Sequence, residues 1–377
     1  RQMCIRDRIN TLRTSLNAHH ASQARLRGLT LELLPLQPFA EKHLMTLLDA
    51  PLPDGQAFAQ LEWLRVAPRF GTLSGTLQQT YAYSQTRENG LLRLMRNFAA
   101  NTSYYTGTGL VLPGSDKPLN ASLDALIAAC RDLDVGQKYQ DELERIFHPA
   151  PQAMLAADKR SGLKLATEIA ALQGNISADV QIALREVVDH GEPHRQQGLT
   201  GDPMLLKALG QPVADGLLIH LRDKAGNERG IVLYLASDPR QALRFFDDAT
   251  AMNSMLASLL KEPSYWQYFT QLISIEHRAA FVSTLGMRLK DALPDLALEG
   301  TAPGGGIFTE LATRQVHRVK NDARLLLVPT ADADSQAISA RHAQWKAAGL
   351  DLINLAGLFI PVVGALLLGQ LVAQTLS

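Results

Sequence analysis

The residues best suited to hold a metal ion are His190 and His194, which lie on either side of Gly191, Glu192 and Pro193. Two histidines at this spacing can bind one ion when both lie on the same face of a helix. Glycine and proline between them oppose a helix through this span. We therefore interpret the pair as part of an exposed loop and predict no metal site here.

A second pattern with chemical potential is Asp332-Ala333-Asp334, since Asp-x-Asp pairs hold divalent ions in sugar-nucleotide transferases. Here the pair follows Pro329-Thr330 and precedes a helical pattern, where carboxylates commonly cap the helix N-terminus. We favour capping over metal binding. His19 and His20 have no carboxylate or cysteine at ligand spacing, and we expect them on a solvated helix face.

The remaining motifs also favour structural roles. Gly304, Gly305 and Gly306 lack the lysine and hydroxyl of a phosphate-binding loop and the spacing of a dinucleotide site, which predicts a flexible linker. Neither a Gly-x-Ser-x-Gly nor a His-Glu-x-x-His motif occurs. Cys130 lies on an apolar helical stripe and is predicted to be a core residue. The sequence thus predicts no catalytic residue, no cofactor and no metal, and a non-enzymatic role is favoured for this chain.

Two further groups could contact ligands, but packing and solvation explain them more simply. An aromatic cluster after Pro263 could bind a ligand, although helix packing is favoured; it comprises Tyr265, Trp266, Tyr268 and Phe269. A basic group could meet phosphate or lipid head groups, although a solvated helix face is favoured; it comprises Arg314, His317, Arg318, Lys320 and Arg324.

Composition places the chain among globular proteins with two or three domains. Its 377 residues include 37 Lys and Arg against 37 Asp and Glu, and this balance argues against nucleic acid as a partner. Only 2 cysteines occur, which excludes a disulfide scaffold.

Apolar residues recur at helical spacing over much of the chain. The helices that this spacing predicts include residues 123–130, 180–188 and 252–259, and Gly136 fits the end of the first. Two apolar runs, residues 216–221 (GLLIHL) and 230–235 (GIVLYL), flank a turn containing Gly226 and predict a β-hairpin. Residues 71–84 favour a weaker strand pair. We expect a mainly α fold with a small antiparallel β-hairpin (α+β), and a multi-helix, bundle-like body that ends in an apolar helix or helical hairpin.

Four segments are expected along the chain. Residues 1–8 (RQMCIRDR) resemble translated sequencing-adapter sequence and are expected to be a non-native artefact. Residues 9–195 predict a helical N-terminal subdomain, residues 196–330 a subdomain of hairpin and helices, and residues 331–377 a helix leading into an apolar segment. The last segment stops within that apolar run, so we expect the chain to be a fragment, and no secretory signal is visible.

After Asp351 the chain carries no charged residue, and the run is long enough for a bilayer, which requires roughly 20 apolar residues. Pro361 and Gly364 near its centre favour a broken helix or a hairpin. A membrane-inserting segment and a core helix that packs on a downstream module are both compatible with this composition. The candidates for membrane insertion are Leu352, Ile353, Leu355, Leu358, Phe359, Ile360, Pro361, Val362, Val363, Leu366, Leu367, Leu368 and Leu371.

Several stretches, taken in order, resemble the N-terminal domain family of dermonecrotic-toxin-like proteins from Gram-negative bacteria. They are residues 91–98, 126–139 (LIAACRDLDVGQKY), 232–246 (VLYLASDPRQALRFF), 263–269, 321–334 (NDARLLLVPTADAD) and 349–364. The resemblance runs from about Pro38 onward, and the order and spacing of the stretches carry it.

The resemblance implies a secreted toxin or effector with a role in virulence, in which this region precedes other modules. It implies no catalytic residues here. We expect the region to serve delivery, attachment or membrane translocation of a downstream module, with a host membrane or host proteins as partners and the host cell as destination. The alternative is an interaction scaffold that packs on the downstream module through the apolar tail.

Overall fold

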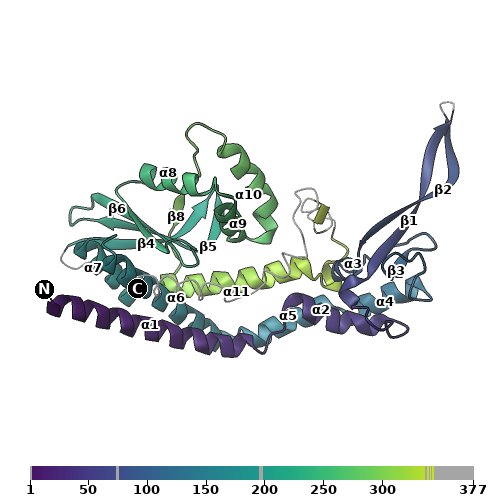
Figure 1. The fold of residues 1–377 in the computed structure, drawn as a ribbon, viewed down its shortest axis with the longest axis horizontal. Coiled ribbons are helices and arrows are strands. Elements are labelled where there is room, and N and C mark those ends of the chain that lie inside the picture. The colour runs from purple at the N-terminus through teal and green to yellow at the C-terminus, as the bar shows by residue number, and fades with distance from the viewer. Residues whose placement is uncertain are drawn as a thin grey trace. The chain divides into compact units, whose positions relative to one another are not determined.

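The computed structural model describes residues 2–73, 76–194 and 198–335, together with 338, 340, 342 and 343 (Figure 1). The chain divides into two compact units. One unit contains the residues up to Leu33 and Arg145–Val319, and the other contains Leu34–Glu144 and the described residues from Lys320 onward. Each unit therefore combines segments that are far apart in the sequence.

The first unit is built on a five-stranded antiparallel sheet with the order β7-β6-β5-β4-β8. Its strands are β4 (Thr200–Ala208), β5 (Gln211–Arg222), β6 (Glu228–Leu235), β7 (Leu243–Phe246) and β8 (Glu299–Thr301). The predicted hairpin is confirmed as β5 and β6. Its turn is closed by Asp223, whose N–H donates to the Asn227 carbonyl at 3.0 Å, and Gly226 supplies a φ of 85°.

Helices cover both faces of this sheet (Figure 1). One face buries Leu217, Ile219 and Val232 with α6 (Pro149–Leu172), α7 (Ala178–His190) and the first turns of α11 (Ile307–Leu326), and α1 (Gln2–Thr30) packs along α6. The opposite face buries Leu218 and Leu233 against α8 (Ala249–Leu259), α9 (Pro263–Gln271) and α10 (Ile275–Arg288). Because successive strand residues point to opposite faces, two covered faces require apolar side chains at consecutive positions.

The second unit contains a three-stranded antiparallel sheet with the order β2-β1-β3. The expected strand pair at residues 71–84 is confirmed, but it is part of longer strands, β1 (Glu62–Leu73) and β2 (Thr76–Asn89). The other elements of this unit are α2 (Leu36–Leu44), η1 (Met45–Leu47), η2 (Phe58–Gln60), α3 (Gly90–Met95), β3 (Gly109–Val111), α4 (Leu123–Leu133), α5 (Val135–Ile146), the last turns of α11, and η3 (Thr330–Asp332).

The expected fold class, mainly α with one small hairpin, is wrong. The described residues contain two antiparallel sheets, of 3 and 5 strands, beside the helices. The strands that the sequence concealed have weak signals: β1 and β4 contain Pro68 and Pro203, and β8 has only 3 residues. Proline is typical of strand edges and bulges, and a bulge does follow Pro68.

Every candidate for membrane insertion between Leu352 and Leu371 lies outside the described residues. Within the described part of the chain, no helix combines the length and the apolar character needed to cross a membrane.

Gly136 is required by a close approach of two backbones in the second unit. A Cβ at this position would lie 2.5 Å from the carbonyl carbon of Val328 and even closer to the nitrogen of Pro329. The sequence predicts Gly136 at the end of α4 (Leu123–Leu133), but Asp134 takes the left-handed position there, with φ 43°. The glycine therefore serves packing rather than helix termination.

We expect Gly136→Ala to lower the free energy of unfolding by about 1–3 kcal/mol, because neither backbone can move away without strain. Denaturant unfolding followed by circular dichroism measures this loss. Gly286→Ala is the matched control, since its new methyl would meet only Trp266 at an ordinary 3.8 Å. Equal stability of Gly136→Ala and the parent chain would contradict the packing role.

Candidate functional site

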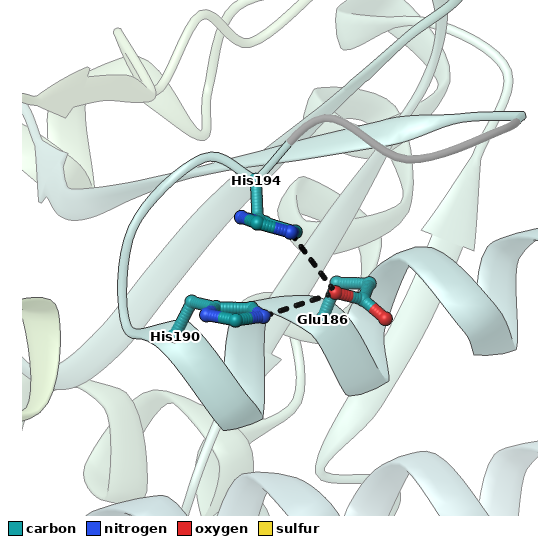
Figure 2. A group of neighbouring side chains, drawn as sticks. All are labelled: Glu186, His190 and His194. Carbon is teal, nitrogen blue, oxygen red and sulfur yellow. Dashed lines mark ion pairs between the residues drawn. The ribbon is translucent and has the colours of Figure 1, made fainter.

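Three side chains near the end of α7 form the candidate site (Figure 2). Glu186 and His190 are one helical turn apart and lie on the same face of α7. Gly191 then ends the helix with φ 72°, and its carbonyl accepts a hydrogen bond from the Ile307 N–H at 3.0 Å. The chain turns back, and the His194 ring stacks on the His190 ring with centroids 3.8 Å apart.

Both imidazoles direct Nε2 toward the same carboxylate oxygen (Figure 2). Glu186 Oε2 lies 3.2 Å from His190 Nε2 and 4.0 Å from His194 Nε2, and one ligand atom from each residue lies within 4.8 Å of the others. This oxygen is buried, yet it makes no hydrogen bond to any described residue. Both histidine side chains are about 40% exposed, so the group opens to solvent.

The sequence predicted that His190 and His194 form no common site, whereas the structure brings both rings to Glu186. We expected no ion site because Gly191 and Pro193 forbid one helix through both histidines, and a turn brings the two rings together instead. Glu186 was missed entirely. Its position one turn before His190, within a helix that the apolar pattern had predicted, was the signal that could have found it.

His19 lies in the core of the first unit, so the expected solvated helix face is wrong for this residue. It is only 3% exposed because α1 packs along α6. Its Nδ1 lies 2.7 Å from Ser161 Oγ and 3.7 Å from Asp158 Oδ1, and its Nε2 contacts Gln23.

These residues have the types of a catalytic triad but not its geometry. A triad places serine and carboxylate on opposite ring nitrogens, whereas Ser161 and Asp158 share Nδ1 of His19. The Ser161 hydroxyl also donates to the Asp158 backbone carbonyl at 2.9 Å. The group is a buried hydrogen-bond network rather than a nucleophile and its base.

Burial, together with the nearby charges of His20 and Lys159, lowers the pKa of His19 from 6.5 to about 4. The unfolded chain therefore takes up a proton on this ring before the folded chain does. Stability is complete above pH 6.5 and falls between pH 6.5 and 4. Asp158 faces His19, and burial raises its pKa, which partly opposes this loss in acid.

Acidification from pH 7 to 5 should therefore cost the first unit about 2 kcal/mol through His19 alone. We expect His19→Asn to reduce the pH dependence of the unfolding free energy by this amount, measured by denaturant titration at both pH values. His277→Asn, which changes an exposed histidine on α10, should leave the pH dependence unchanged. An undiminished pH dependence in His19→Asn would exclude the histidine as its source.

Asp238 forms a second buried polar network in the first unit. Its Oδ2 accepts hydrogen bonds from Arg244 at 2.6 Å and from the Tyr265 hydroxyl at 2.5 Å, and its Oδ1 accepts from the backbone N–H groups of Arg240 and Gln241. Asp238 is 1% exposed. The carboxylate thus joins the β6–β7 connection to α9.

Asp238→Asn would leave the guanidinium of Arg244 buried without its counterion, and we expect a loss of about 3–5 kcal/mol in unfolding free energy. Thermal and denaturant unfolding measure the change. Arg240→Gln, which removes only an exposed ion pair with Glu262, should cost less than about 1 kcal/mol. Similar losses in the two variants would rule out this role of the buried pair.

The two aspartates of the Asp-x-Asp pattern serve different partners in the second unit. Asp332 pairs with Arg324, whereas Asp334 accepts from the Ala100 N–H at 2.6 Å and lies 3.5 Å from Arg131. Asp332 lies inside a 3₁₀ turn, so the predicted helix cap is wrong at this residue.

The other predicted residues have structural places. Cys130 is buried, as predicted, and burial raises the pKa of its thiol to about 12. Tyr265 and Phe269 lie in the core, which confirms helix packing for these two aromatics. The basic group is less solvated than expected: Arg318 donates to the backbone carbonyls of Gln271 and Leu272.

A comparison with family models relates the chain to known proteins. No curated protein matches the chain. The profile of the dermonecrotic toxin N-terminal domain matches residues 31–276, a range that contains Glu186, His190, His194 and Asp238. Because this match covers more than half of the 377 residues, the chain belongs to the dermonecrotic toxin N-terminal domain family.

Proposed function

We propose that this region delivers a toxin polypeptide: it attaches to a host membrane, inserts the apolar segment at residues 352–376, and so carries a downstream module toward the host cell. Membership of the dermonecrotic toxin N-terminal domain family supports a toxin context. The observation that carries the membrane step is the absence of charge after Asp351. In this proposal the region has no catalytic role.

The driving force is the burial of apolar side chains, at about 25 cal/mol per Å² removed from water. A run without Asp, Glu, Lys or Arg avoids the cost of placing a charge in hydrocarbon. Pro361 and Gly364 near the middle favour two short apolar arms, and each arm is too short to span a bilayer alone. The segment would therefore enter as a shallow or re-entrant hairpin.

The pKa of His19 supports an acid-assisted version of this step. The buried neutral ring connects α1 to Ser161 on α6, and below about pH 6.5 the unfolded chain takes up a proton on this ring, which lowers the stability of that packing. An acidic compartment would thus loosen the first unit while leaving the uncharged apolar segment unaffected. Insertion is expected to increase on acidification.

One structural feature favours protein attachment as a second candidate function. The β1–β2 ribbon pairs with β3 only through residues 62–64, and it projects from the rest of its unit (Figure 1). Beyond Leu64, β1 has one partner strand among the described residues. A strand edge of this kind can accept an extended segment of another protein, which suits an interaction scaffold.

Liposome flotation distinguishes insertion of the apolar segment into a membrane from packing of that segment on another module. We expect the full chain to float with vesicles, more at pH 5 than at pH 7, and the chain ending at Gly349 to remain in the unbound fraction. Equal flotation of both chains would exclude insertion through the apolar segment. If neither floats and only the full chain aggregates, an apolar surface that normally packs on another module is favoured.

A further inference from the structure

We propose that Glu186, His190 and His194 form a binding site for Zn²⁺. The proposal is independent of membrane delivery, since it rests on the α7 side chains alone. Two imidazole nitrogens and one carboxylate oxygen are a zinc ligand set that occurs with water in the fourth position. The partial exposure of both histidines leaves room for that water on the solvent side.

The distances fit an ion between the three side chains. Zinc bonds of about 2.0–2.1 Å in tetrahedral geometry place neighbouring ligand atoms roughly 3.3–3.5 Å apart. Glu186 Oε2 lies 3.2 Å from His190 Nε2 and 4.0 Å from His194 Nε2, which is near this range. Small rotations of the side chains are sufficient to centre an ion.

The chemistry of the donors selects the class of ion. Calcium and magnesium prefer sets made of oxygen atoms, whereas imidazole nitrogen suits zinc, copper and nickel. The buried Glu186 Oε2, which no described residue supplies with a hydrogen bond, supports a positively charged ligand at this point. An ion pair between Glu186 and His190 explains the short distance between these two side chains. It does not explain why Nε2 of His194 also points toward Glu186 Oε2.

The scaffold holds two of the three ligands in place before an ion binds. Leu184, Val187 and Val188 of α7 are buried in the core beside the sheet, which fixes the outward face that carries Glu186 and His190. The bond from Ile307 to the Gly191 carbonyl holds the helix end. Only His194, on the connection to β4, has to settle on the ion.

Bound zinc would therefore tie the connection between α7 and β4 to the end of the helix. Because an ion that binds only the folded chain stabilises it by mass action, zinc should raise the unfolding temperature of the first unit. This effect gives a readout that requires no enzymatic activity.

The test uses the full chain after removal of metal with EDTA. We expect isothermal titration calorimetry with ZnCl₂ to give one equivalent with a dissociation constant of about 1 μM or tighter. Titration with CoCl₂ should produce the intense visible bands of four-coordinate cobalt. His190→Ala/His194→Ala should weaken zinc binding by at least about 100-fold, at about tenfold or more for each ligand lost.

Two further variants separate loss of ligands from loss of folding. Glu186→Gln keeps the size of the side chain and should weaken binding by about tenfold or more with an unchanged circular dichroism spectrum. His220→Ala is the matched control, because Nδ1 of His220 also lies 3.1 Å from a glutamate oxygen, Oε2 of Glu228. Among the described residues, His220 belongs to no group of three side chains that could hold a metal ion. It should bind zinc as the parent does.

Zinc affinity that is equal in the parent and in His190→Ala/His194→Ala would overturn the proposal. An absence of binding at about 100 μM zinc would also overturn it, since a dissociation constant weaker than about 100 μM is typical of scattered surface histidines. An equal loss in His220→Ala would place the ion elsewhere and would also overturn it.

Discussion

The burial of both faces of the five-stranded sheet is the constraint on which the first unit depends. Leu217 and Leu218 are neighbours in the chain, yet they belong to cores on opposite sides of the sheet. The positions of β5 from Gly216 to Ile219 are therefore buried on both faces, and every covering helix must present an apolar stripe. This requirement fixes α7 through Val187 and Val188, and so orients Glu186 and His190 away from that core.

Buried polar groups then fix the connections that the apolar core leaves undetermined. Asp238 joins the β6–β7 connection to Tyr265 on α9. In the second unit Thr330 donates from its N–H to Asp134 and from its hydroxyl to the Arg131 carbonyl. Such bonds are directional, and a buried partner left alone is costly, so each one specifies a single arrangement.

The stretches that resemble the toxin family meet at these connections. Residues 232–246 and 263–269 contribute Asp238 and Tyr265, and residues 126–139 and 321–334 contribute Asp134 and Thr330. The features that made the sequence recognisable are thus parts of the architecture.

Local pattern was sufficient for elements whose signal is contained in a short window. Helical spacing of apolar residues predicted most of α4, α7 and α8, and two apolar runs around a turn predicted β5 and β6. It failed for β4 and β8, because a strand stabilised by distant partners needs no strong pattern of its own. The predicted fold class was wrong because strands with weak local signals were not recognised.

The sequence by itself determined the toxin family, the β5–β6 hairpin and the burial of Cys130. Only the tertiary structure decided the places of the titratable groups. His19 became a core residue because α1 packs on α6, and His194 reached His190 because Gly191 reverses the chain. Apolar periodicity indicates the face that a segment buries. The neighbours of a polar side chain depend instead on turns and on distant segments, which no local pattern contains.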